Sequence, residues 1–138
     1  MQADEIMTDQ VVTVTTTNTL ADALEVLAGL DVRHLPVVDD GELVGILSDR
    51  DIRSLGFHRV EDMKTVDRLH EVARTPVARV MSADVRAVEP GTDVREVIDR
   101  MLQEQVGALP VVEPHTRQLV GIISYIDVLR AASELFQD

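Results

Sequence analysis

The chain has no cysteine among its 138 residues. Disulfide bonds, thiolate zinc sites and cysteine nucleophiles are therefore excluded. Aromatic side chains are almost absent, since Phe57, Tyr125 and Phe136 are the whole set. Three rings are too few for a platform on which nucleic-acid bases could stack.

Positive charge is also scarce. The chain carries 13 Lys and Arg against 25 Asp and Glu, which gives a net charge of −12. A protein this acidic lacks the basic surface that a phosphate backbone requires, so we expect no nucleic-acid partner. The longest apolar run, Leu119–Ile126, is far shorter than the roughly twenty residues of a membrane-spanning helix, and no secretion signal is visible. We therefore expect a cytoplasmic protein that contacts no membrane.

The most informative feature of the sequence is an internal duplication. Residues 6–53 can be laid over residues 80–129 with matches in the same order. A Leu-Pro-Val-Val run occurs at Leu35–Val38 and again at Leu109–Val112, and a Leu-Val-Gly-Ile run occurs at Leu43–Ile46 and at Leu119–Ile122. Such self-similarity indicates two copies of one structural unit.

Each copy predicts the same elements. A short β-rich run (11–14, 85–88) precedes a helix with an N-cap signal at Thr19 or Asp93. Two extended runs follow (35–38 and 43–47; 109–112 and 119–123), and a last helix is capped by Ser48 or Ser124. The sequence therefore predicts an α+β fold of tandem β-α-β-β-α repeats.

One copy alone would be a marginal domain, because three strands and two helices leave apolar faces uncovered. We expect the copies to pack as one pseudo-twofold module. The first repeat should span residues 1–56, a charged connector residues 57–74, and the second repeat residues 75–138.

A second duplicated pattern lies where a strand passes into the last helix of each copy. A glycine is followed by a serine and then an aspartate at the same spacing: Gly45, Ser48 and Asp51, and Gly121, Ser124 and Asp127. A glycine lets a flat group approach the strand, and a serine with the free N–H groups of a helix start can hold phosphate. An aspartate one turn further on can accept hydrogen bonds from two ribose hydroxyls. This combination suggests a nucleotide.

A simpler interpretation exists, because Ser-x-x-Asp at a helix start is a common capping pattern. Capping and ligand binding can also coexist, since the cap positions the groups that would face a ligand. The repetition of the whole pattern in both copies favours a role in binding.

The duplicated unit, its Leu-Pro-Val-Val runs and its Gly-x-x-Ser-x-x-Asp endings resemble a CBS domain pair, or Bateman module. The resemblance covers nearly the whole chain. It implies clefts between the repeats that bind adenosine-containing ligands such as AMP, ADP, ATP or S-adenosylmethionine. It also implies a regulatory role, and a homodimer formed through helices.

The resemblance further assigns individual roles. Asp51 and Asp127 would bind ribose, Ser48 and Ser124 phosphate, and the base would lie against segments that contain Val12, Thr13, Arg86 and Ala87. Arg33 and His34 would complete the Asp127 cleft, which should bind phosphate more strongly than the Asp51 cleft. The net negative charge favours mono- or diphosphates, with magnesium only if a polyphosphate brings it.

Other functions have less support. No two histidines have metal-ligand spacing, and no nucleophile, P-loop lysine or zinc signature is present, so we expect neither a metal site nor an enzyme. The alternative is a structural or protein-interaction module with vestigial clefts. The regulated protein would be separate or part of a longer chain. An apolar stripe from Val128 to Phe136 could serve as core or as a subunit contact.

Overall fold

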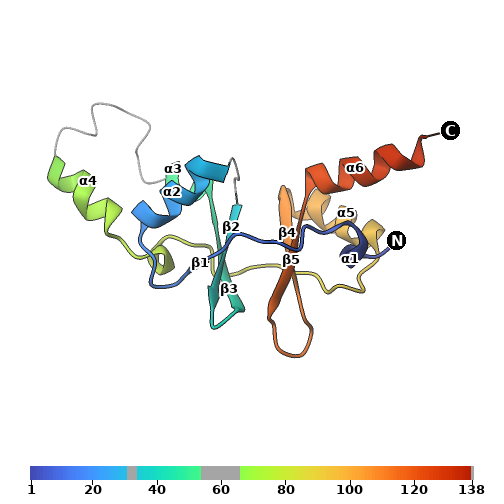
Figure 1. Cartoon of the computed structure of the whole chain (residues 1–138), viewed down its shortest axis with the longest axis horizontal. Coiled ribbons are helices and arrows are strands. Elements are labelled where there is room, and N and C mark those ends of the chain that lie inside the picture. Colours follow the sequence, from blue (N-terminus) through green and yellow to red (C-terminus); the bar gives the residue numbers. More distant parts are fainter. Residues whose placement is uncertain (31–33, 54–65, 138) are drawn as a thin grey trace. The chain divides into compact units, whose positions relative to one another are not determined.

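The computed structural model describes residues 1–30, 34–53 and 66–137. In chain order the elements are α1 (Ala3–Ile6), β1 (Val14–Thr15), α2 (Leu20–Leu30), β2 (His34–Asp39), β3 (Glu42–Ser48), α3 (Asp49–Arg53), α4 (Val66–Ala73), the 3₁₀ helix η2 (Val77–Arg79), α5 (Val94–Glu104), β4 (Ala108–Val112), β5 (Leu119–Ser124) and α6 (Tyr125–Leu135) (Figure 1). The mixture of helices and strands confirms the predicted α+β class.

The sheets follow the predicted repeat. In the first copy β1, β2 and β3 form one sheet, in which β1 runs parallel to β2 and Val14 pairs with Val37. In the second copy β4 pairs antiparallel with β5, and a single parallel bridge from Val88 to Val111 replaces the first strand. The initial strands are shorter than predicted and β1 is shifted, since β1 consists of Val14 and Thr15. Of the predicted runs 11–14 and 85–88, Val14 and Val88 are the residues that pair with the neighbouring strand.

The turn between β2 and β3 and the helix starts follow from local residues. Asp40 (φ 50°) and Gly41 (φ 81°) take the left-handed conformation that a tight hairpin between β2 and β3 requires. Before α2, the Thr19 N–H donates to Asp22 at 3.0 Å, and Thr19 Oγ1 accepts from the Asp22 N–H at 3.3 Å. The Thr19 N–H, with smaller contributions from the Thr19 and Asn18 side chains, holds the pKa of the exposed Asp22 carboxyl below its ordinary value. At α5 the predicted N-cap Asp93 accepts from the Arg95 N–H, and Glu96 forms an ion pair with Arg100 at 3.2 Å.

The chain folds into two compact units that we describe separately. The first-repeat unit contains Val12–Asp40 and Val44–Val85, and the second-repeat unit contains Met1–Val11, Gly41–Leu43 and Arg86–Asp138. Each has its own apolar core. The first is built on Val14, Leu20, Ala23, Leu35, Val37, Leu47, Ile52 and Val77, and the second on Ala3, Val88, Val97, Met101, Leu109, Val111 and Ile123.

These units do not follow the sequence repeats, because the leading segment of each repeat packs on the other repeat. Residues 1–11 belong with the second repeat, and residues 75–85 with the first. Equivalent backbone hydrogen bonds hold both segments: Ala3 to Thr92 (2.7 Å) and Val94 to Met1 (3.0 Å), and Val77 to Asn18 (2.8 Å) and Leu20 to Thr75 (2.9 Å). Figure 1 shows α1 beside the elements of the second repeat. The sequence analysis did not predict this exchange.

The predicted connector, residues 57–74, is described only in its last part. Residues 54–65 lie outside the described residues. Helix α4 contacts α2, and its Val72 packs against the core of the first-repeat unit. This end of the connector is therefore part of a packed unit.

Further along, each leading segment pairs with the strand that carries the motif glycine. Thr8 and Ile122 exchange two backbone hydrogen bonds (2.8 and 2.9 Å), and Ser82 and Ile46 do the same (2.9 and 3.0 Å). The preceding methionines fill the space above the glycines, Met7 over Gly121 and Met81 over Gly45. A side chain at either glycine would collide with that methionine.

This packing predicts the effect of adding one methyl group. Gly121→Ala should destabilise the protein by about 1–3 kcal/mol, because the new Cβ meets Met7 and also the Thr8 carbonyl, which lies 3.1 Å from the Cβ position. Gly91→Ala is the control, since a Cβ there meets nothing within 4 Å. Urea unfolding of both variants measures the difference. Equal midpoints would contradict the proposed packing role.

Candidate ligand-binding site

The β5–α6 junction places Ser124 and Asp127 together. Ser124 is the N-cap of α6, and its Oγ accepts from the Asp127 N–H at 3.3 Å. In return Asp127 Oδ2 accepts from the Ser124 N–H at 2.9 Å and from Ser124 Oγ at 3.2 Å. The simpler interpretation of the motif, a helix cap, is therefore confirmed at this junction.

The β3–α3 junction repeats this arrangement. The Ser48 N–H donates to Asp51 Oδ2 at 2.9 Å, and Ser48 Oγ accepts from the Asp51 N–H at 3.0 Å. Both motif copies thus form the same reciprocal cap. The described part of α3 spans Asp49–Arg53, and α6 spans Tyr125–Leu135.

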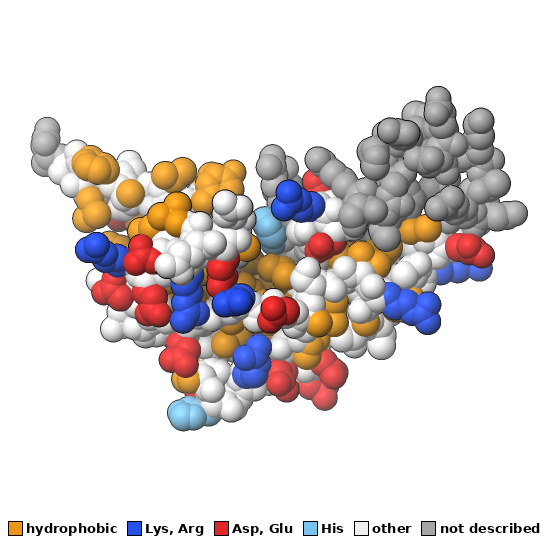
Figure 2. All heavy atoms as spheres, turned by 180° about the vertical axis from the view of Figure 1, so that it is seen from behind, with side chains coloured by type: hydrophobic (Ala, Val, Ile, Leu, Met, Phe, Trp, Pro, Cys, Tyr) orange, Lys and Arg blue, Asp and Glu red, His pale blue; other side chains and the backbone are white. Residues whose placement is uncertain are grey.

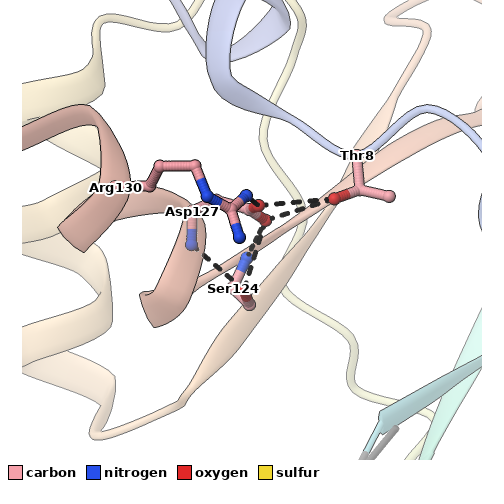
Figure 3. A network of polar contacts seen from close by, with 4 residues as sticks. All are labelled: Thr8, Ser124, Asp127 and Arg130. Atoms are coloured by element: carbon pink, nitrogen blue, oxygen red, sulfur yellow. Dashed lines mark hydrogen bonds and ion pairs between the residues drawn. The ribbon is translucent and has the colours of Figure 1, made fainter. Parts of the chain in front are cut away.

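At the second junction Asp127 has further partners. The side chain is buried, with 7% of its surface exposed. Thr8 Oγ1 lies 3.4 Å from Asp127 Oδ1, and Arg130 Nη1 lies 3.5 Å from the same oxygen. Figure 3 shows these two groups approaching Asp127, one from the N-terminal segment and the other from the next turn of α6.

Thr8 is a site residue that the sequence analysis missed. Its only signal is that Thr8 aligns with Ser82 in the duplication, so both copies carry a hydroxyl after the methionine. Its proximity to Asp127 depends on the exchange of leading segments. Local patterns carry no information about that exchange.

The junction is less open to an anion than the sequence suggested. Among the first N–H groups of α6, that of Tyr125 donates to the Gly107 carbonyl at 2.9 Å and that of Asp127 to Ser124 Oγ. The Asp127 carboxylate also places negative charge at the helix start. A ligand group that donates a hydroxyl therefore suits this position better than a bare phosphate. The cation near the junction that a phosphate could contact is Arg130, whose side chain is 70% exposed.

The remaining predicted residues are spread over both units. Val12, Thr13 and His34 belong to the first-repeat unit with Asp51, and Arg86 and Ala87 to the second-repeat unit with Asp127. Their ligand roles stay predictions.

Two of these residues have partners in the second-repeat unit. Arg86 forms an ion pair with Glu104 at 3.2 Å, and the Ala87 carbonyl accepts from Arg100 at 3.1 Å. Arg33 lies outside the described residues, so its predicted contribution to the Asp127 site also stays a prediction.

Within residues 1–30, 34–53 and 66–137, no three His, Asp or Glu side chains gather as metal ligands would. In that same part, every helix is too short or too polar to cross a bilayer.

Comparison with known families identifies the fold. The profile of the CBS domain matches residues 3–57 and residues 77–134. The chain therefore belongs to the CBS domain family and carries two copies of the domain, as the resemblance implied.

Individual relatives agree with this assignment. The AcuB protein of Vibrio cholerae is 33% identical, with a TM-score of 0.80 over 98% of this chain and 92% of that one. The CBSX2 protein, solved in complex with AMP, is 27% identical, with a TM-score of 0.82 over 99% of this chain and 98% of that one, and CBSX2 comes from Arabidopsis thaliana. The uncharacterized protein MJ1225 of Methanocaldococcus jannaschii is 30% identical over 92% of this chain, which spans only 45% of MJ1225.

The caps predict a stability effect that needs no ligand. Ser124→Ala should destabilise the protein by about 1 kcal/mol, because the Asp127 N–H loses its acceptor at the start of α6. Ser133→Ala, an exposed position near the end of the same helix, is the control. Denaturant unfolding measures both. If Ser133→Ala lowered the free energy of unfolding as much as Ser124→Ala, the capping role of Ser124 would be contradicted.

Proposed function

We propose that this chain is a regulatory module that binds an adenosine-containing nucleotide at its Gly-x-x-Ser-x-x-Asp junctions and signals binding to a regulated protein. The observation that carries the proposal is the duplicated junction, together with a buried carboxylate at Asp127 whose Oδ1 contacts, among the described residues, are 3.4 Å to Thr8 and 3.5 Å to Arg130. The AMP complex of CBSX2, which shares the fold over nearly its whole length, supports the ligand class.

Each group at the junction would have a distinct role. Asp127 and Asp51 would accept hydrogen bonds from ribose hydroxyls. Arg130 would supply positive charge for a phosphate, and Ser124 would contribute only by turning its hydroxyl from Asp127 Oδ2 toward the ligand. Because the chain carries a net charge of −12, AMP or ADP should bind better than ATP, and magnesium would enter only with a polyphosphate.

Ligand binding predicts a stabilisation that one substitution removes. AMP at about 100 times its dissociation constant should stabilise the protein by about 2.7 kcal/mol. Thermal shift with AMP, ADP, ATP, S-adenosylmethionine and NADH would identify the ligand, and calorimetry would give its affinity. Asp127→Asn should weaken binding at this junction, because an amide is a poorer acceptor for ribose hydroxyls.

The matched control is Asp99→Asn, since Asp99 is an exposed carboxylate on α5 of the same unit. Equal losses of affinity in the two variants would contradict the role of Asp127. Failure of every nucleotide to bind at millimolar concentration would contradict the proposed function.

The second candidate is a structural or protein-interaction module. Two specific observations favour it: the reciprocal caps account for the serines and aspartates, and the methionines account for the glycines. No ligand is needed to explain the motif in this case. The nucleotide titration distinguishes the candidates, because this one predicts no stabilisation.

We also propose that the module is a homodimer that associates through α6. The apolar side chains Tyr125, Ile126, Leu129, Leu135 and Phe136 are all exposed, Leu129 by 60% and Phe136 by 85%. Figure 2 shows hydrophobic side chains gathered along the end of this helix. Val128 and Ala131 occupy the other side of α6, toward the core, so one helix provides both core and exposed surface. A continuous apolar patch of this kind is typical of an interaction site.

The dimer predicts a change of mass. Leu129→Asp should shift the protein from dimer to monomer in size-exclusion chromatography with light scattering, because the charge would be buried at the contact. Ala78→Asp adds the same charge at an exposed position in η2 and should leave the dimer intact. A monomeric wild type at micromolar concentration would contradict this proposal.

A further inference from the structure

The two oxygens of Asp127 have different environments. Oδ2 is committed to the helix cap, where it accepts from the Ser124 N–H at 2.9 Å and from Ser124 Oγ at 3.2 Å. The Thr8 hydroxyl lies 3.4 Å from Oδ1 and 3.5 Å from Oδ2, and the Arg130 guanidinium lies 3.5 Å from Oδ1, so among the described residues Oδ1 has no contact shorter than 3.4 Å. Hydroxyl-to-oxygen bonds are ordinarily about 2.7–2.8 Å, so the Thr8 contact is weak.

The backbone of Thr8 is nevertheless firmly held. Its N–H donates to the Ile122 carbonyl at 2.8 Å, and its own carbonyl accepts from the Ile122 N–H at 2.9 Å. The Thr8 side chain is exposed, whereas Asp127 is buried. The hydroxyl can therefore leave Asp127 by rotating about χ1 and bonding to water, without any change in the strand pairing.

We propose that Thr8 is a positioning residue that occupies Asp127 Oδ1 in the free protein and gives it up to the hydroxyls of a bound ribose. This inference rests on the proposed nucleotide function. A carboxylate oxygen accepts about two hydrogen bonds, so a ribose diol needs the positions that Thr8 and Arg130 now hold. The ligand class is a nucleotide with free 2′ and 3′ hydroxyls.

Competition of this kind predicts two effects of opposite sign. Thr8→Val keeps the shape of the side chain and removes the hydroxyl. The free protein should become less stable, because Asp127 Oδ1 loses a donor. AMP should bind about two- to fivefold more tightly, the range expected for one weak hydrogen bond that the ligand no longer displaces.

The ligand 2′,3′-dideoxyadenosine monophosphate is the matched control, since it has no hydroxyl to offer Asp127. The dideoxy ligand should bind wild type and Thr8→Val with the same affinity. The affinity for AMP divided by the affinity for the dideoxy ligand should therefore be higher in Thr8→Val than in wild type. Thr8→Ser restores a hydroxyl and should return that ratio to the wild-type value. In an Asp127→Asn background the effect of Thr8→Val should vanish, as a double-mutant cycle would show.

Calorimetry with the two ligands distinguishes the possible outcomes. If wild type binds no AMP, the proposed function fails, and this inference fails with it. If wild type prefers AMP to the dideoxy ligand and Thr8→Val leaves that preference unchanged or reduces it, the proposed function stands and the competition is refuted. A lower melting temperature with an unchanged preference would show that Thr8 only stabilises the fold.

Discussion

The structure depends on the pairing of each leading segment with a strand of the other repeat. Two hydrogen bonds between Thr8 and Ile122, and two between Ser82 and Ile46, fix these segments in equivalent positions. Because of this pairing, Ala3 and Val77 become fully buried, each in the core that is otherwise built mainly from the other repeat. The same pairing brings Thr8 to Asp127. The exchange therefore determines both the packing and the chemistry of the site.

The sequence was sufficient for the fold because the relevant signals are local and occur twice. The runs at 35–38 and 109–112 are buried strands, and the Asp40–Gly41 turn takes the backbone angles that its composition predicts. The exchange could not be predicted in the same way. The two repeats have the same sequence pattern. The pattern therefore does not indicate whether a leading segment pairs with a strand of its own repeat or of the other repeat.

The candidate site was predicted in part for a similar reason. Ser124 and Asp127 are three residues apart, so their cap follows from helix geometry, and the sequence analysis identified it as one interpretation. Thr8 is distant in sequence, and only tertiary pairing connects it to Asp127. The glycines were correctly singled out, but their packing against Met7 and Met81 has the same long-range origin.

A third cap in the chain shows that the capping motif alone does not indicate a ligand-binding site. Thr19 and Asp22 form the same reciprocal cap at the start of α2, yet Asp22 is exposed, and its carboxylate binds the Thr19 N–H and Asn18. A cap of this kind is thus no argument for a ligand. Asp127 differs from Asp22 because its side chain is buried and Arg130 lies on the next turn of α6. In addition Thr8, from a distant segment, places its hydroxyl 3.4 Å from Oδ1 and 3.5 Å from Oδ2. Since capping needs only Oδ2, the case for a ligand rests on Oδ1.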